Sequence, residues 1–174
     1  MKNILFALMI LSLFSCRTMT WTKIQTNAIF GEGIYLKKYL YDYNSPRTLF
    51  LGDGYSFTVF ELPNDYSEYI NKNFDLIEKN YPMNNSFRNE WNIEPWKVTP
   101  INNYDDNAYI NRFVISPFYD EKNHEYKIYK KYIEMILNEE GNYYCYFYSE
   151  GRRDIDFYVY VPKEKILIMI NHLT

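Results

Sequence analysis

The chain has 174 residues, of which 47 % are hydrophobic and 24 % charged, a composition that excludes a disordered or collagen-like chain and is typical of one globular domain. Its formal net charge of −3 at pH 7 provides no basic surface, so we expect no nucleic-acid partner. Aromatic residues make up 20 % of the chain, and 20 residues are tyrosine.

The first residues have the pattern of a secretory signal peptide. Lys2 is followed by an apolar run from Ile4 to Phe14, and the small residue Ser15 ends the segment. This run is much shorter than the roughly 20 residues that span a bilayer. We therefore expect residues 1–15 to be a signal peptide that is removed on export.

Leu13, Ser15 and Cys16 resemble the lipobox of bacterial lipoproteins, in which leucine stands three residues before a lipidated cysteine. The resemblance covers only the first 16 residues. It implies cleavage before Cys16 and several acyl chains on the new N-terminus, and two or more such chains anchor a protein stably. Arg17 stands where aspartate often signals inner-membrane retention, so the resemblance favours the outer membrane over the inner. Residues 17–23 contain no acidic residue, whereas lipoproteins exported to the cell surface resemble one another in a short acidic signal after the cysteine, so a periplasm-facing anchor is expected.

The rest of the chain is expected to form a tether and one domain. Residues 16–26 are mostly polar and are expected to form the lipidated N-terminus and the tether, while no linker or repeat divides residues 27–174. With Cys16 lipidated, Cys145 is a lone thiol in an exported protein. We expect Cys145 to be buried by packing, with no disulfide in the domain.

The first part of the domain is expected to consist of strands. Residues 33–41 are rich in β-forming side chains. Two more apolar runs, 48–51 and 55–60, flank the turn residues Gly52-Asp53-Gly54, which predict a hairpin.

A helix is predicted to follow this hairpin. Apolar residues recur at helical spacing from Tyr66 to Tyr81, and Pro82 ends the pattern. Asp65 and Glu68 have the spacing of a capping box at the helix start.

The middle of the chain is harder to interpret, and the last third is clearer. Residues 83–108 are expected to be an irregular connection, and residues 109–118 fit a helix or a strand equally well. A second helix is predicted over residues 124–139, with Gly141 as its stop. Strands are then predicted over residues 143–149, 154–161 and 165–171.

These elements together predict an α+β fold. It has one antiparallel sheet, built from an N-terminal hairpin and a C-terminal three-strand meander, with about two helices packed on one face of the sheet.

Familiar catalytic and metal-binding motifs are missing from the sequence. It contains no Gly-x-Ser-x-Gly, no His-Glu-x-x-His and no phosphate-binding glycine loop. Its two histidines, His124 and His172, are expected at the surface. We therefore predict no catalytic residue, no metal and no cofactor.

Tyrosines alternate along two of the predicted strands. Strand side chains alternate with period two, so each row of tyrosines shares one face, which we expect to point outward, opposite a greasy face. Such a surface is typical of recognition sites, although cross-strand tyrosine pairs that only stabilise the sheet explain the same pattern. The candidate binding tyrosines are Tyr144, Tyr146, Tyr148, Tyr158 and Tyr160.

Two tryptophans form a second candidate binding site. Trp91 and Trp96 lie beside Glu90 and Glu94, and acidic and aromatic side chains together are what a sugar site needs. The alternative is that both tryptophans pin the irregular connection to the core.

Three functions remain open at this point. We favour a membrane-anchored, non-catalytic protein-binding module, of which an immunity-type protein that blocks a basic toxin is one form. The second is a lipoprotein that binds carbohydrate or another component of the cell envelope. The third is a hydrolase with an unrecognised carboxylate pair.

Overall fold

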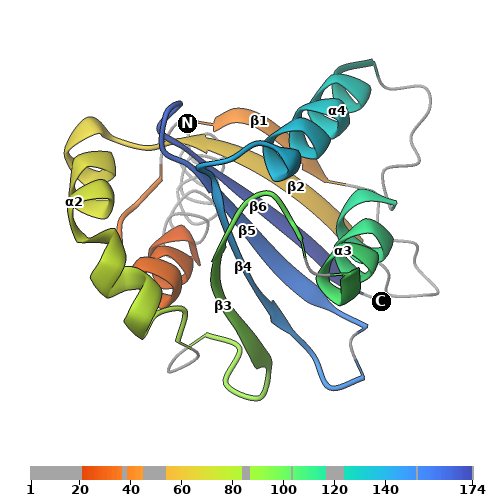
Figure 1. The fold of residues 1–174 in the computed structure, drawn as a ribbon, viewed down its shortest axis with the longest axis horizontal. Helices are drawn as coiled ribbons and strands as arrows, with labels where there is room; N and C mark the ends of the chain where they lie inside the picture. Colours follow the sequence, from red (N-terminus) through yellow and green to blue (C-terminus); the bar gives the residue numbers. More distant parts are fainter. Residues whose placement is uncertain are drawn as a thin grey trace, which may run out of the picture.

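A six-stranded antiparallel sheet runs through the centre of the molecule, in the order β1-β2-β6-β5-β4-β3 (Figure 1). The computed structural model describes residues 21–36, 39–44, 54–83, 87–102, 104–116, 124–151 and 153–173. The strands are β1 (Tyr39–Asn44), β2 (Gly54–Glu61), β3 (Asn92–Val98), β4 (Tyr143–Tyr148), β5 (Ile155–Val161) and β6 (Ile166–Leu173).

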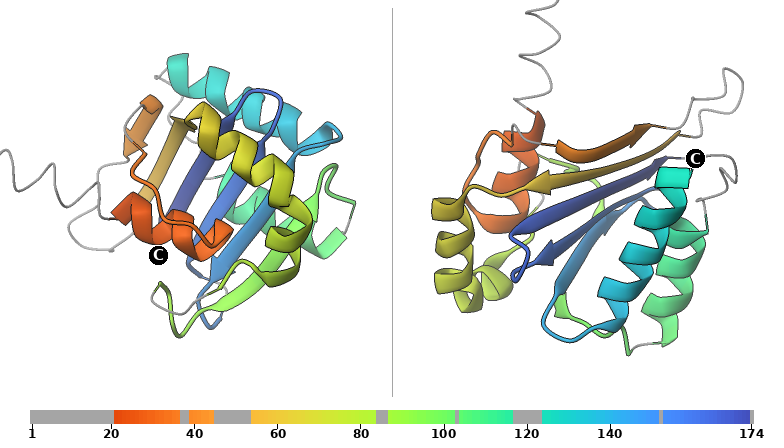
Figure 2. Two further views of the ribbon diagram at one scale, coloured as in Figure 1. Left: turned by 90° about the vertical axis from the view of Figure 1, so that its left-hand side faces the viewer. Right: turned by 90° about the horizontal axis from the view of Figure 1, so that it is seen from above.

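Helices cover both faces of this sheet (Figure 2). On one face lie a helix formed by residues 21–30 and the helix α2 (Asn64–Asn80). The other face carries α3 (Tyr104–Ile110), which continues into the π-helix η1 (Asn111–Ile115), and α4 (His124–Asn138). The molecule therefore has three layers, with the sheet in the middle.

Each side of the sheet has its own apolar core. Every side chain of the central strand β5 is buried, because consecutive residues point to opposite faces and both faces are covered. The core under α3 and α4 includes Phe57, Val59, Ile110, Val114, Ile133, Phe157, Val159 and Ile168. The core under α2 and residues 21–30 includes Phe30, Ile70, Phe74, Trp96, Phe147, Tyr158, Tyr160 and Leu167.

The α+β class, the single antiparallel sheet and the C-terminal meander are confirmed. The two predicted helices correspond to α2 and α4, and the last three strands to β4, β5 and β6. β2 pairs with β1. The predicted strand over residues 48–51 lies outside the described residues.

The expectation that helices pack on one face only is wrong, because apolar clusters with helical partners lie on both faces. The tether expected up to residue 26 also differs from the structure, since residues 21–30 are helical. This helix buries Ile29 and Phe30 completely, so it is part of the domain core.

The segment 83–108 is more regular than expected. It contains β3 and most of α3. Pro95 lies in β3, and the pairing with β4 shifts between Glu94 and Lys97. Proline is tolerated in an edge strand because no ladder hydrogen bond needs its missing N–H. Residues 109–115 are helical, which resolves the open choice for that segment.

The expected capping box of α2 is not formed. The helix begins at Asn64, two residues earlier than a cap at Asp65 implies, and no side chain caps its first turn. Asp65 instead lies within the first turn, where its negative charge faces the positive end of the helix dipole.

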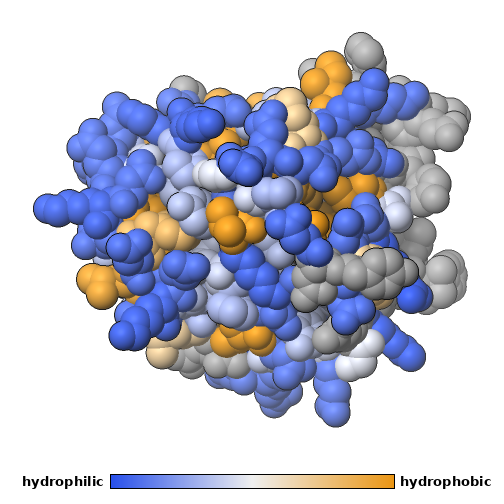
Figure 3. Space-filling model, viewed as in Figure 1, coloured by the Kyte–Doolittle hydropathy of each residue, from blue (hydrophilic) through white to orange (hydrophobic). Residues whose placement is uncertain are grey.

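In the part of the chain that the structure describes, no helix has the length and apolarity needed to cross a membrane. On the face seen in Figure 3, hydrophobic residues outside the grey parts form separate patches among hydrophilic ones.

Candidate functional site

The tyrosine rows of β4 and β5 do not form the outward surface that their alternation suggested. Tyr146 lies opposite Phe157, and Cys145 lies opposite Tyr158. The tyrosines of the two strands therefore point to opposite faces, and helices cover both faces. Tyr144, Tyr146, Tyr158 and Tyr160 have exposed fractions of 2 % or less, so they cannot contact a partner; Tyr148 is half-buried.

Tyr144 and Tyr146 bind a buried carboxylate. Both hydroxyls donate to Asp106, at 3.2 and 3.0 Å. The Lys97 Nζ lies 2.6 Å from the same carboxylate and 2.9 Å from Glu94. These bonds tie the edge strand β3 to α3 and β4.

Electrostatics favours the ionised form of Asp106. Burial acts to raise its pKa, but the hydrogen bonds from Lys97 and Tyr146 outweigh burial and lower the pKa below the ordinary value. Since each group in this cluster has a partner, it is best explained as structural.

The other two buried tyrosines also have partners. The Tyr158 hydroxyl accepts a hydrogen bond from Gln25, at 3.1 Å. The Tyr160 hydroxyl donates to Asn71, at 2.6 Å. Each bond joins the sheet to a helix above it, so these tyrosines connect layers of the fold.

The two candidate tryptophans have different environments. Trp96 is buried, stacks on Phe30 with ring centroids 5.2 Å apart, and donates from its indole nitrogen to the carbonyl of Ile29. Trp96 therefore anchors β3 to the core. This agrees with the alternative that the tryptophans pin this part of the chain to the core rather than bind a sugar. Trp91 is half-buried, and the guanidinium of Arg88 lies 4.0 Å from its ring centroid.

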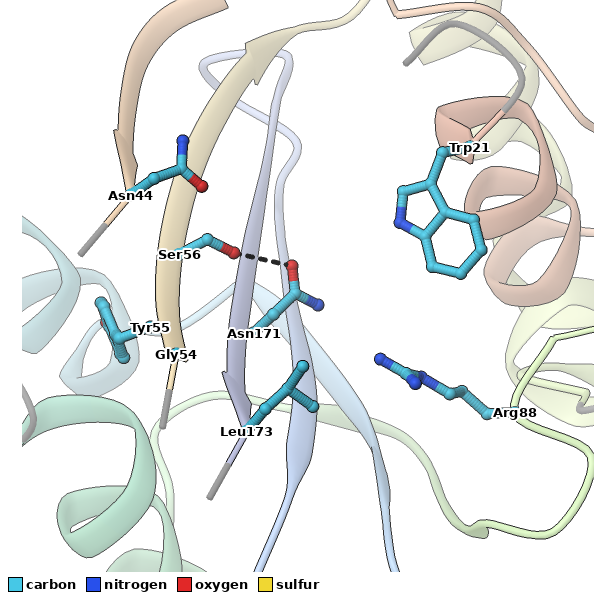
Figure 4. A pocket seen from close by; sticks show the side chains of 8 residues that line it. All are labelled: Trp21, Asn44, Gly54, Tyr55, Ser56, Arg88, Asn171 and Leu173. Atoms are coloured by element: carbon cyan, nitrogen blue, oxygen red, sulfur yellow. Dashed lines mark hydrogen bonds between the residues drawn. The ribbon is translucent and has the colours of Figure 1, made fainter. Parts of the chain in front are cut away.

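A hollow of about 470 Å³ opens where the ends of β1, β2 and β6 face the helix of residues 21–30 (Figure 4). Trp21 and Arg88 stand on one side of it, and Ser56 and Asn171 on the sheet side. The ring of Tyr55 turns to the opposite face of the sheet, where its hydroxyl donates to the carbonyl of Val114. The hollow is lined by Trp21, Asn44, Gly54, Tyr55, Ser56, Arg88, Asn171 and Leu173.

A row of polar side chains crosses three neighbouring strands behind this hollow. Ser56 lies opposite Asn171 in the β2–β6 pair, and Asn171 lies opposite Asp156 in the β6–β5 pair. Ser56 donates to the Asn171 amide oxygen at 3.1 Å, and the amide nitrogen of Asn171 donates to Asp156 at 2.5 Å. The strand register therefore builds this row directly.

Arg88 closes the row. Its Nε and Nη2 donate to the two oxygens of Asp156, at 2.5 and 3.2 Å. Asp156 is fully buried, whereas the Arg88 side chain keeps 23 % of its surface exposed. Burial raises the pKa of the Asp156 carboxyl, and the bonds from Arg88 and Asn171 act in the opposite direction.

A second hollow, of about 340 Å³, adjoins the same arginine. Trp21 and Arg88 line both hollows. The ring of Trp21 meets the ring of Phe87 edge-on, with centroids 5.3 Å apart. The second hollow is lined by Trp21, Phe87, Arg88, Asn89, Glu90 and Trp91.

The polar row could have been suspected from the sequence. Asp156 is the one charged residue of the buried strand β5, and Asn171 follows the apolar run Ile166–Ile170 of β6. A polar side chain inside a covered sheet needs a partner. The sequence does not indicate that Arg88, far away in the chain, supplies that partner.

These side chains are suited to binding. Over the described residues, no three His, Cys, Asp or Glu side chains are grouped to hold a metal ion. Cys145 is buried, and burial raises the pKa of its thiol well above the ordinary value, so it is a poor nucleophile. His172 lies apart from the hollow, with its Nδ1 3.1 Å from the carbonyl oxygen of Phe113. The side chain of His124 is outside the described residues.

Comparison with known proteins gives no relative: the chain matches no protein-family model, no curated protein and no solved structure.

Proposed function

We propose that the protein is an exported lipoprotein, anchored to a bacterial membrane through Cys16, whose domain binds a saccharide of the cell envelope without converting it. The hollow between Trp21 and Asn171 is the observation that supports this proposal. Indole rings offer an apolar surface to the C–H face of a sugar ring. Side-chain amides, a hydroxyl and a guanidinium offer the placed donors and acceptors that sugar hydroxyls need.

Binding is favoured over hydrolysis because the carboxylate behind the first hollow, Asp156, is bound by the protein itself. A glycosidase needs one carboxyl to donate a proton to the substrate and another to attack or to activate water. Asp156 is fully buried and bound to Arg88 and Asn171. Its oxygens are therefore engaged by the protein itself.

The protein-binding hypothesis, including its immunity-type form, is no longer supported by a tyrosine surface. Four of the five tyrosines that suggested a protein-binding surface are in the core. Saccharide binding is therefore the better-supported proposal.

The binding proposal can be tested with the mature lipidated chain in detergent on an array of cell-envelope glycans, followed by titration monitored by tryptophan fluorescence. We expect Trp21→Ala to weaken binding at least about tenfold, equivalent to ~1.4 kcal/mol. Tyr35→Ala is a matched control, because Tyr35 is as exposed as Trp21, at 45 % and 46 %, but lines a different hollow. Absence of binding to any glycan, or equal effects of the two variants, would contradict the proposal.

The anchor is tested separately. The wild-type protein should partition into detergent and carry the mass of several acyl chains at its N-terminus. Cys16→Ser should remain uncleaved at this position. A soluble wild-type protein with an unmodified N-terminus would disprove the anchor and leave the binding proposal unaffected.

A further inference from the structure

We infer that the ligand is an uncharged oligosaccharide of at least two sugar rings, which lies across Arg88 and occupies both hollows; this inference rests on the proposed function. The two hollows share Trp21 and Arg88 as walls. Their volumes of about 470 and 340 Å³ each fall in the range of about 300–1,000 Å³ for small-molecule sites. Each can therefore hold a part of one extended ligand.

Arg88 is held firmly between the two hollows. Two hydrogen bonds to Asp156 fix the guanidinium of Arg88. The centroid of the Trp91 ring lies 4.0 Å from the same guanidinium. Its backbone has a φ of 56°, in the left-handed region that few side-chain-bearing residues adopt. A ligand therefore has to pass over this side chain, because the bonds to Asp156 oppose its displacement.

The charges around Arg88 favour a neutral ligand. Asp156 already neutralises the guanidinium, since both of its oxygens are bound to it. Glu90 adds a negative charge to the second hollow. An acidic sugar would meet this carboxylate, and like charges repel. Among the described residues that line the two hollows, the one cation is Arg88, which is already paired with Asp156.

The two hollows offer different contacts along the ligand. The first offers amide and hydroxyl groups from Asn44, Ser56 and Asn171. The second adds Glu90 and the Trp91 ring. Trp21, which is 46 % exposed, lines both and offers one continuous apolar surface. We therefore place one sugar ring against the strand ends and the next beside Glu90.

The test measures affinity against ligand length. Neutral glycans of one to six rings, in N-acetylglucosamine and glucose series with different linkages, are titrated together with glucuronic-acid-containing counterparts. We expect at least tenfold tighter binding of two rings than of one. Asn44→Ala should weaken all lengths by the same factor. Glu90→Gln should weaken binding only for two rings or more, and Glu78→Gln, on the exposed side of α2, should weaken none.

The outcomes separate this inference from the proposed function. Equal affinity for one ring and two, an effect of Glu90→Gln on the single ring, or preference for acidic glycans would overturn the inference and leave saccharide binding standing. Failure of all glycans to bind would overturn both. Glu90 is exposed, so its substitution does not endanger folding.

Discussion

At the scale of single residues, the buried carboxylates of Asp106 and Asp156 are paired with side chains of other elements. Asp156 is bound by Arg88 and Asn171, and Asp106 by Lys97 and two tyrosines. A buried charge that loses its partner keeps its desolvation penalty without compensation. Substitutions that remove one partner are therefore expected to affect stability more than exposed substitutions do.

Tyr146→Ala tests whether the β4 tyrosines belong to the core. Tyr146 and Phe157 are both buried in the same apolar cluster. Tyr146→Ala and Phe157→Ala should therefore each lower the free energy of unfolding by about 3–5 kcal/mol. The measurement is urea unfolding followed by circular dichroism. Tyr69→Ala, at an exposed tyrosine of α2, is the control and should cost less than about 1 kcal/mol. A similarly small effect for Tyr146→Ala would mean that this face is open to solvent.

The pKa of Asp106 predicts how stability depends on pH. Because its pKa is lower in the folded protein than its ordinary value of 3.8, the unfolded chain binds the proton more readily. Its stabilising contribution is therefore present above pH 3.8 and is lost as the pH falls through the lower, folded value.

Asp106→Asn should reduce the loss of folding stability at acid pH. The free energy of unfolding of both proteins is measured from about pH 6 to about pH 2, where the wild type should lose more than the variant. Asp75→Asn, on the exposed side of α2, is the control. Parallel profiles for wild type and Asp106→Asn would contradict the prediction. Asp156, whose pKa is raised, contributes in the opposite direction and equally in both proteins.

At the scale of secondary structure, periodic segments could be predicted from the sequence and pairings could not. The stripe Tyr66, Ile70, Phe74 and Ile77 predicts α2, because helical spacing alone puts these residues on one side. Alternation in β4 and β5 likewise shows which residues share a face within a strand.

The alternation of side chains within a strand does not determine the register between strands. Pairing Cys145 with Tyr158 puts the two tyrosine rows on opposite faces, and a shift of one residue would put them on the same face. The same limit applies to the candidate site, because the row from Ser56 to Asp156 exists only in this register.

The remaining differences between the predicted and the observed elements have local causes. β3 was not predicted, because a proline such as Pro95 usually argues against a strand. Here Pro95 is accommodated because β3 lies at the edge of the sheet. The helix of residues 21–30 was not predicted, because it contains polar residues such as Gln25, which are typical of a tether. Gln25 is nevertheless buried, with its amide on Tyr158.

Phe30→Ala tests whether that helix is part of the domain. Phe30 is fully buried and stacks on Trp96, so its loss should cost about 3–5 kcal/mol in urea unfolding. Trp21→Ala, on the exposed side of the same helix, should cost about 1 kcal/mol or less. Equal, small effects would show that residues 21–30 do not support the fold.

At the scale of the whole molecule, two helical layers enclose the sheet without a disulfide among the described residues. Packing of the two cores must then supply the stability that many exported proteins obtain from disulfides. The domain is expected to fold reversibly in the presence of a reductant.

The reactivity of Cys145 reports on this packing. In a Cys16→Ser variant Cys145 is the single thiol of the chain, and it is fully buried with a raised pKa. We expect a thiol reagent to label it only at the rate at which the protein unfolds, and fully in urea. Rapid labelling of the native protein would indicate that the layer over this face opens easily.

The position of β6 means that the sheet is completed only after residues 166–173 have paired. This strand lies between β2 and β5, and its residue Asn171 is bonded to Ser56, 115 positions earlier in the chain. Contacts so distant form slowly, because the entropy of a long loop is lost before any contact stabilises it. Until residues 166–173 pair with β2, one edge of β2 has no partner, and an unpaired apolar strand is prone to join other chains. A holding chaperone would therefore protect this protein most in the interval before β6 pairs with β2 and β5.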